Sequence, residues 1–255
     1  MSNPAAPPFA KTADPVLPPP DRTALFLDFD GTLVDIVETP DGVTVPAHVH
    51  DVLAALAAAT GGATAIISGR TVSDVRKFLH GFDGTIVGSH GAEWFADGEL
   101  ESHPLAGSDA VAEATARAHA FAEGDDRLLV EEKPAGVVLH YRRAPEREDE
   151  VRAAVKTIAR GIEGLVPSPA KMACELRPAD VSKRGAVARL AGDAPFAGRT
   201  PAYFGDDHTD EAAMEWVLEQ GGTAVKIGEG KSCAPHRLAT PADVVALLAD
   251  WTGGK

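Results

Sequence analysis

Short apolar runs alternate with longer amphipathic stretches through much of the chain. A short apolar run with polar neighbours is typical of a strand buried on both faces, whereas apolar residues at helical spacing predict a helix that covers a sheet. We expect buried strands at residues 24–27, 63–67, 85–88, 202–205 and 223–227. We expect helices at residues 46–60, 71–79, 183–190 and 210–218 and from residue 240 onward. This alternation predicts a doubly wound α/β fold with a parallel sheet.

The pattern changes between residues 105 and 178. Helices are predicted at 110–123 and 146–162, and strands at 128–132, 137–141, 165–166 and 172–176. Because the earlier alternation then resumes, we expect a small α+β domain at 105–178, inserted into a Rossmann-like core of residues 22–104 and 179–255. Residues 1–21 are rich in Pro and Ala and are expected to be a disordered tail.

The first apolar run ends in Asp28-Phe29-Asp30-Gly31-Thr32. Side chains two apart on a strand share a face, so Asp28 and Asp30 converge at the carboxyl end, where open α/β sheets bind ligands. Two unpaired carboxylates repel each other, and a hard divalent cation stabilises both. The alternative is an acidic turn, while a calcium loop would need glycine in place of Leu33. We interpret the pair as a magnesium site.

Further polar residues follow other predicted strands or begin helices. Ser68 follows 63–67, Lys183 begins a helix, and Asp206 and Asp207 follow 202–205. A serine hydroxyl at a helix start can hold a phosphate oxygen, a lysine can neutralise charge shared by aspartate and phosphate, and Asp206 would complete the metal ligands. Taken singly, Ser68 is also a helix cap, Lys183 a solvated surface residue, and the two aspartates loop acids. Together they predict phosphoryl transfer to an aspartate.

Composition narrows the class of partner. The chain has 255 residues with 24 Lys and Arg against 38 Asp and Glu, a formal charge of -14. This negative charge argues against nucleic acid or an anionic membrane as a partner. Because the chain as a whole would also repel an anionic substrate, a phosphate site must gather positively charged side chains locally. Cys174 and Cys233 do not form a disulfide framework, and neither a leader pattern nor a membrane-length apolar run is present. The expected location is the cytoplasm.

The motifs resemble a family within a superfamily. Asp28 to Thr32, Ser68, Lys183 and 205–207 with Asp210 resemble the haloacid dehalogenase superfamily of phosphohydrolases. The chain beyond the tail is similar to the trehalose-6-phosphate phosphatase family. That narrower resemblance rests on six segments: Ser68-Gly69-Arg70, Gly88-Ser89-His90-Gly91, Glu131-Glu132-Lys133, His140-Tyr141-Arg142, 171–178 and 205–211.

The resemblance implies a role for each core residue. Asp28 is the nucleophile, and Asp30 protonates the leaving sugar oxygen and then activates water against an aspartyl-phosphate. Ser68 and Lys183 hold the transferring group. The implied Mg²⁺ site comprises Asp28, the backbone carbonyl of Asp30 and Asp206, with Asp207 and Asp210 in its outer shell.

In the resembled family the inserted domain closes over the core as a cap and reads the sugar. The resemblance assigns Glu131, Lys133 and Glu175 to sugar hydroxyls. Further substrate-binding candidates are Arg70, His90, His140, Arg142, Lys171 and Arg177. The alternative is that the charged residues form solvated ion pairs of small energetic weight and that His90 makes a structural hydrogen bond.

The implied function is a Mg²⁺-dependent phosphatase of trehalose 6-phosphate, acting in trehalose biosynthesis. One alternative is a phosphatase of another sugar phosphate, such as sucrose phosphate or mannosylglycerate phosphate, since a fold does not fix a substrate. Another is a non-catalytic sugar-phosphate-binding regulator, against which the presence of both Asp28 and Asp30 counts. We expect a monomer, with a trehalose-phosphate synthase as the candidate protein contact.

Overall fold

The computed structural model describes residues 15–37 and 42–253. The chain divides into two compact units. The first unit comprises residues 1–67, 76–85 and 187–255, and the second comprises 68–75 and 86–186. Within the described ranges, no helix is both long and apolar enough to cross a membrane.

The described part of the first unit contains five parallel strands in the order β12-β11-β10-β1-β2. Their bounds are β1 Thr23–Leu27, β2 Thr64–Ile67, β10 Thr200–Gly205, β11 Thr223–Ile227 and β12 His236–Leu238. In β1 every residue is buried, with Phe26 opposite Tyr203 and Leu27 opposite Ile66. An apolar run of this kind requires cover on both faces of the sheet.

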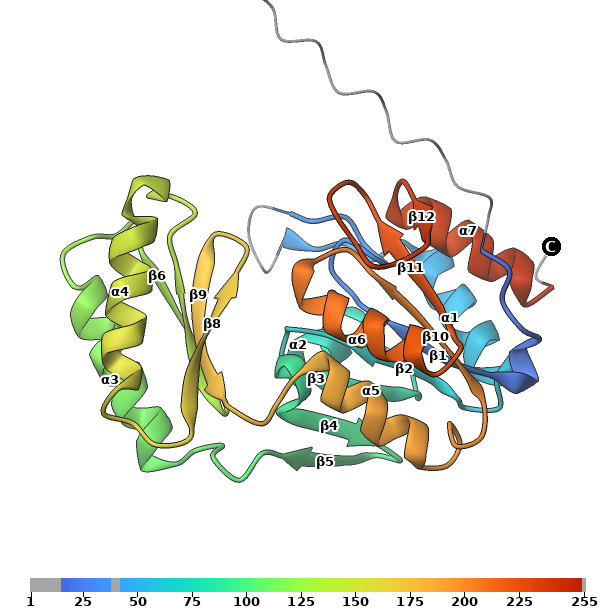
Figure 1. The fold of residues 1–255 in the computed structure, drawn as a ribbon, viewed down its shortest axis with the longest axis horizontal. Coiled ribbons are helices and arrows are strands. Elements are labelled where there is room, and N and C mark those ends of the chain that lie inside the picture. The colour runs from blue at the N-terminus through green and yellow to red at the C-terminus, as the bar shows by residue number, and fades with distance from the viewer. Residues whose placement is uncertain (1–14, 38–41, 254–255) are drawn as a thin grey trace, which may run out of the picture. The chain divides into compact units, whose positions relative to one another are not determined.

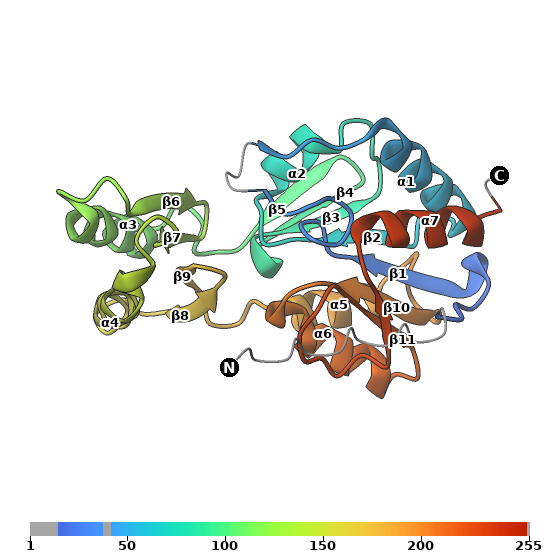
Figure 2. The ribbon, with the colours of Figure 1, turned by 90° about the horizontal axis from the view of Figure 1, so that it is seen from above.

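Helices supply that cover (Figure 1). Figure 2 shows α1 (Ala47–Ala59) and α7 (Pro241–Trp251) on one face of the parallel strands and α6 (His208–Glu219) on the other. α1 buries Val49, Leu53 and Leu56, the stripe that helical spacing predicted. The doubly wound α/β prediction is therefore confirmed. Two further helices, α2 (Val72–Phe78) and α5 (Lys183–Gly192), cross the boundary between the units in sequence.

The predicted tail of residues 1–21 overlaps the described structure from residue 15. Residues 20–22 form the short helix η1 (Pro20–Arg22). The Pro18 carbonyl accepts hydrogen bonds from the Thr23 hydroxyl at 3.2 Å and from Trp251 Nε1 at 2.9 Å. Pro18 is thus attached to α7, while residues 1–14 lie outside the described part.

The second unit contains a four-stranded antiparallel sheet in the order β6-β7-β9-β8. Its strands are β6 Leu129–Lys133, β7 Gly136–His140, β8 Leu165–Ala170 and β9 Ala173–Pro178. α3 (Asp109–Ala122) and α4 (Glu148–Ala159) lie side by side on one face of this sheet (Figure 1) and bury Val111, Val155 and Leu176 with it. This is the α+β arrangement expected for the inserted segment.

The same unit holds β4 (Glu93–Ala96), β5 (Glu99–Ser102) and all of β3 (Thr85–Gly88) except its first residue. β4 and β5 form a hairpin around Asp97-Gly98, whose φ angles of 54° and 82° suit a tight turn. Between β3 and β4, the short helix η3 (Ser89–Gly91) has three consecutive positive φ angles. Backbone in this region is costly for Ser and His, so the surrounding structure must hold it.

Two element predictions were wrong in detail, and strand β12 was missed. Met172 is a turn residue with φ 56°, because β8 and β9 form a longer hairpin around it. The helix predicted at 146–162 is α4 preceded by η4 (Pro145–Arg147), because proline suits a first helical turn. β12 is three residues long, which is too short for periodicity to reveal.

Candidate active site

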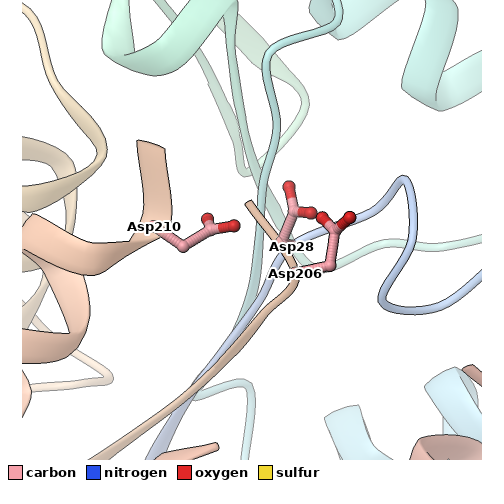
Figure 3. Close-up of side chains that lie close together, drawn as sticks. All are labelled: Asp28, Asp206 and Asp210. Carbon is pink, nitrogen blue, oxygen red and sulfur yellow. The ribbon is translucent and has the colours of Figure 1, made fainter. Parts of the chain in front are cut away.

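Three carboxylates meet at the carboxyl ends of β1 and β10 in the first unit (Figure 3). Asp28 follows β1, Asp206 follows β10, and Asp210 lies in α6. The parallel pairing brings the strand ends together, since the Asp28 N–H donates to the Phe204 carbonyl at 2.9 Å. Ligand oxygens of the three aspartates lie within 4.8 Å of one another, and Asp28 and Asp210 are buried.

Two glycines make room for this cluster. Gly31 has φ 76°, and a Cβ there would lie 2.3 Å from Asp206 Oδ2. A Cβ on Gly205 would lie 2.5 Å from Asp210 Cγ. Any side chain at either position would push a carboxylate away. The oxygen-only donors and the close fit suit a hard divalent cation, which relieves the repulsion of the three acids.

Asp210 has both oxygens held by protein donors. The Tyr203 hydroxyl donates to Oδ1 at 2.7 Å, and the Asp207 N–H donates to Oδ2 at 2.9 Å. Burial, followed by the nearby Asp210 charge, raises the pKa of Tyr203 well above its usual value, so the hydroxyl keeps its proton. Thr32 donates in the same way to Asp28 Oδ2 at 3.3 Å. Donors therefore fix the orientation of two of the three acids.

Asp30 and Asp207, the other two predicted metal residues, have other surroundings than the three-aspartate cluster. Asp30 is half-buried and forms an isolated bridge with Val34. Asp207 is the N-cap residue of α6, and its Oδ1 lies 3.1 Å from His208 Nδ1. Among the described residues, neither carboxylate joins the three-aspartate cluster.

Ser68 and Lys183 are both buried, and both belong to the second unit. The Ser68 hydroxyl accepts the Arg70 N–H at 3.1 Å. The Ser68 and Arg70 carbonyls accept the His90 and Ser89 N–H groups at 3.0 and 2.7 Å, so the strained segment η3 holds this turn. Lys183 begins α5 and is 4% exposed, which excludes the alternative of a solvated surface residue.

Lys133, Glu175 and His90 form a buried network. Lys133 Nζ donates to Glu175 Oε1 at 3.1 Å and to the Gly69 carbonyl at 2.9 Å. His90 Nε2 lies 3.4 Å from Glu175 Oε2, and the His90 ring packs so closely on Gly69 that a Cβ there would lie 2.7 Å from Cε1. The sequence-predicted residues Lys133, Glu175, His90 and the loop of Ser68 are thus joined in one unit.

The charges in this network follow from burial and pairing. Burial opposes the charged form of Lys133, but the nearby acids, Glu175 first and then Glu131, together outweigh it and raise the pKa of Lys133. Burial likewise opposes ionised Glu175, but Lys133 and then His90 lower the pKa of Glu175. For His90 burial prevails, although Glu175 opposes it, and the pKa falls to about 4. At neutral pH the pair is charged and His90 is neutral.

The remaining candidates have other contacts. Glu131 Oε2 lies 2.7 Å from His140 Nε2, and both side chains are partly exposed. Burial works to raise the pKa of Glu131, but the hydrogen bond from His140 and the charge of Lys133 lower it. Arg177 donates to the Val181 carbonyl, while Arg142 and Lys171 are exposed.

Sequence reasoning missed Tyr203 and Lys226. Tyr203 lay in a predicted buried strand, and its hydroxyl within an apolar run was the available signal. Lys226 is a buried lysine in β11 whose Nζ donates to the Asp206 carbonyl. A charged residue inside a predicted buried strand is unusual and was the signal for this second residue.

Solved structures define the fold class. The chain matches a haloacid dehalogenase-like hydrolase from Bacteroides thetaiotaomicron with a TM-score of 0.65 and 14% identity, covering 90% of this chain and 98% of that one. It matches the C-terminal domain of trehalose-6-phosphate phosphatase from C. albicans with a TM-score of 0.77 and 23% identity, covering 91% and 92%. The chain therefore has the fold of these haloacid dehalogenase-like proteins.

Sequence relatives define the family. Residues 26–241 match the trehalose-phosphatase family model. Trehalose-6-phosphate phosphatase of Escherichia coli (strain K12) is 37% identical over 232 residues, covering 89% of this chain and 85% of the relative. A probable trehalose-phosphate phosphatase of Sinorhizobium fredii is 37% identical over 209 residues, covering 82% and 78%. The chain belongs to the trehalose-phosphatase family, a family of phosphoric monoester hydrolases.

Proposed function

We propose that this chain hydrolyses trehalose 6-phosphate to trehalose and phosphate through a phosphoryl group carried on Asp28. Membership of the family supports the substrate. The observation that carries the mechanism is the position of Asp28, a buried carboxylate at the end of the central strand, oriented by Thr32 and clustered with two further acids. A carboxylate so fixed can act as a nucleophile toward phosphorus.

The proposed reaction has two displacement steps. An Asp28 oxygen attacks phosphorus, and the bond to the sugar oxygen breaks as Asp30 gives that oxygen a proton. Asp30 then takes a proton from water, the water oxygen attacks phosphorus, and the bond to Asp28 breaks to release phosphate. In this scheme the hydroxyl of Ser68 and the ammonium of Lys183 hold the transferring group and offset its charge.

Mg²⁺ is the proposed cofactor. The carboxylates of Asp28 and Asp206 and the backbone carbonyl of Asp30 would hold it, and Asp210, already held by Tyr203 and the Asp207 N–H, would support the site from outside. When bound, Mg²⁺ neutralises charge on the phosphoryl oxygens and lets two anions approach.

We assign sugar recognition to polar groups of the second unit. Glu131, Lys133 and Glu175 offer fixed acceptors and a donor, which suit hydroxyl groups. Lys133 and Glu175 already form an ion pair, so a bound sugar hydroxyl would add its hydrogen bonds to an existing polar network. The other proposed substrate contacts are Arg70, His90, His140, Arg142, Lys171 and Arg177.

The test is phosphate release from a panel of sugar phosphates, with Mg²⁺ and with excess chelator. We expect trehalose 6-phosphate to be the preferred substrate and chelation to abolish turnover. Asp28→Asn should lower kcat by a factor on the order of 10³ or more while the variant stays folded. Asp35→Asn, which changes an exposed aspartate near the same strand, is the matched control.

Two outcomes would count against this function. Turnover by folded Asp28→Asn at the wild-type rate would exclude the nucleophile, and preference for another sugar phosphate would exclude the substrate. A monomeric state, a contact with a trehalose-phosphate synthase and a cytoplasmic location stay predictions from the sequence. Light scattering tests the first and co-purification with the synthase tests the second.

A further inference from the structure

Segment η3 packs against the backbone beside Ser68 and beside Lys183, all within the second unit. At one place the His90 N–H donates to the Ser68 carbonyl at 3.0 Å. At the other, a Cβ on Gly91 would lie 3.3 Å from the Ser182 carbonyl oxygen, so η3 lies directly against the residue before Lys183. The two side chains that the proposed reaction assigns to the transferring group therefore share one neighbouring segment.

The backbone conformation of this segment needs support. Ser89, His90 and Gly91 have φ angles of 48°, 58° and 119°, and the first two are not glycine. A left-handed conformation is costly for such residues and persists where neighbouring groups hold it. Loss of a contact that holds η3 would let the segment relax, and the backbone that it contacts would move with it.

Glu93 supplies such a contact from β4. The Ser89 hydroxyl donates to Glu93 Oε2 at 2.6 Å, a length typical of a hydrogen bond to an ionised carboxylate. Both residues are buried, with 4% of Ser89 and 3% of Glu93 exposed, so water competes poorly for either partner. Glu93 itself is fixed in the sheet, where it pairs with Gly88 of β3. Its carboxylate thus joins η3 to a strand.

We propose that Glu93 is a positioning residue, which holds η3 through the Ser89 hydroxyl so that η3 keeps Ser68 and Lys183 in place for phosphoryl transfer. This inference rests on the proposed function, in which those two side chains hold the transferring group. It adds a residue to which the proposed chemistry assigns no contact. A displacement of about 1 Å in such a site costs up to about 100-fold in rate, so a residue that acts at second hand can matter.

The charge of Glu93 offers a different explanation, which the test must separate. Burial lowers the pKa of Lys133, and the nearby acids, with Glu175 first and Glu93 last, raise it. If Glu93 acted through Lys133, loss of its charge would impair sugar contacts and spare a substrate that lacks the sugar. Glutamine distinguishes the two explanations, because its side-chain carbonyl accepts the Ser89 hydroxyl and its amide carries no charge.

The experiment compares Glu93→Met, Ser89→Ala and the double variant with wild type, on trehalose 6-phosphate and on a small aryl phosphate. Methionine has a similar length but no oxygen that accepts the hydroxyl. We expect each single variant to lower kcat by about 10- to 100-fold on both substrates, with KM changed by less than about threefold. The double variant should be no worse than the single ones, because both changes remove the same hydrogen bond.

Two further variants act as controls. Glu93→Gln should stay within about threefold of wild type, since it keeps the acceptor for the Ser89 hydroxyl. Glu99→Met changes an exposed glutamate of the neighbouring strand β5 and should leave both activities unchanged.

Amide hydrogen exchange gives a readout that does not depend on activity. The Ser89 and His90 N–H groups donate to the Arg70 and Ser68 carbonyls, so exchange at residues 86–92 reports how firmly η3 is held. We expect exchange there to be faster in Glu93→Met and in Ser89→Ala, and exchange at residues 223–227 of β11 to be unchanged. Equal acceleration in both peptides would show a general loss of stability and overturn the proposal.

Wild-type kcat in folded Glu93→Met or Ser89→Ala would also overturn it, as would losses that multiply in the double variant. A loss in Glu93→Gln as large as in Glu93→Met, and confined to trehalose 6-phosphate, would assign Glu93 to the charge of Lys133 instead. If Glu93→Met does not fold, Ser89→Ala decides on the same substrates.

Failure of the proposed function has a different signature. A wild type that releases phosphate from neither substrate would remove that function, and exchange at residues 86–92 would alone decide whether Glu93 holds the segment. Preference of the wild type for another sugar phosphate would leave the inference standing, with that substrate used in the comparison.

Discussion

The Tyr203 hydroxyl gives the acidic cluster a fixed orientation. It donates to Asp210 from full burial, and water cannot easily replace it there. A hydrogen bond to a charged, buried acceptor contributes more than one at the surface. The cluster therefore depends on a side chain that no part of the proposed chemistry touches.

Tyr203→Phe removes this donor and nothing else of comparable size. We expect a loss of about 1.5 to 3 kcal/mol of stability, the range for a hydrogen bond to a charged group. Because Asp210 then loses one of the donors that orient it toward the cluster, Mg²⁺ affinity should also fall, by about tenfold. Urea unfolding and calorimetric Mg²⁺ titration measure the two effects. Tyr141→Phe changes the other buried tyrosine, in the second unit, and should leave Mg²⁺ affinity unchanged. Unaltered affinity in Tyr203→Phe would contradict this role.

His90 gives the fold a definite pH dependence. Burial lowers its pKa from 6.5 to about 4, against the opposing charge of Glu175. Between these values the unfolded chain binds a proton that the folded chain does not, so this residue makes stability fall as the pH drops from 6.5 toward 4. The slope it contributes is at most about 1.4 kcal/mol per pH unit.

His90→Asn removes that slope and keeps a residue that tolerates positive φ. We expect the variant to be less stable than wild type at pH 7 and the difference to shrink by about 2 kcal/mol at pH 5. Urea unfolding at pH 5, 6 and 7 measures it, with the exposed His119→Asn as control. Parallel pH profiles for His90→Asn and wild type would show that His90 takes up its proton in both states alike.

Residues whose chemistry follows from spacing were predictable. Asp28, Asp206 and Asp210 follow predicted strands or begin a helix, and parallel strands end at the same edge. The partners of these acids could not be predicted from the sequence. The Tyr203–Asp210 hydrogen bond and the contact of Lys226 with the Asp206 carbonyl depend on strand register and side-chain direction. Periodicity reports burial, but it does not report which atoms meet.

At the scale of elements, α7 illustrates a boundary that local sequence determines. The Thr240 hydroxyl accepts the Asp243 N–H, and Asp243 Oδ2 accepts the Thr240 N–H at 3.0 Å. These reciprocal bonds satisfy two donors that the first helical turn would otherwise leave open, and Pro241 at the first position lacks an N–H.

Thr240→Ala should cost about 1 kcal/mol, because it removes the cap oxygen. For a domain of this size the loss corresponds to a decrease in Tm of about 2 to 4 °C. Differential scanning calorimetry measures it, and phosphatase activity at 25 °C should be unchanged. Thr240→Ser keeps the oxygen and should recover most of the loss. An alanine variant as stable as wild type would mean that water replaces the cap.

Elements with a strong local signal were found from sequence, and those set by long-range contacts were not. β11 has the predicted bounds, and α1 differs by one residue at each end, since apolar spacing and Gly61-Gly62 mark the helix. β8 contains Pro167 and Pro169, and prolines in a sequence argue against a strand. In the structure β8 is an edge strand of its sheet, where a missing N–H is tolerated. That position is a property of the whole sheet.

At the scale of the whole molecule, chemistry and sugar recognition are assigned to different residues and can be separated by mutation. Glu175 is a poor probe, because its removal leaves Lys133 buried without its partner, at a cost of about 3 to 5 kcal/mol. Glu131 is a better one, since its side chain is 33% exposed and its partner is His140.

Glu131→Gln should lower kcat/KM for trehalose 6-phosphate by about 10- to 150-fold, the range for a lost hydrogen bond to a charged group, and leave hydrolysis of a small aryl phosphate within about twofold. Steady-state kinetics on both substrates measure this. Glu132→Gln, which changes the exposed neighbour on β6, should alter neither. Equal losses on both substrates for Glu131→Gln would remove Glu131 from sugar recognition.

The central strand of the first unit, β1, gains its second neighbouring strand late in the synthesis of the chain. β1 pairs with β2 on one side, but its other neighbour, β10, begins at Thr200. At a synthesis rate of about 5 to 20 residues per second, this edge of β1 waits roughly 10 to 35 seconds on the ribosome for its partner. An apolar strand with an open edge invites wrong pairing during that time. From the order of strands in the sheet we therefore expect chaperones that shield exposed strands during translation to assist the folding of this protein.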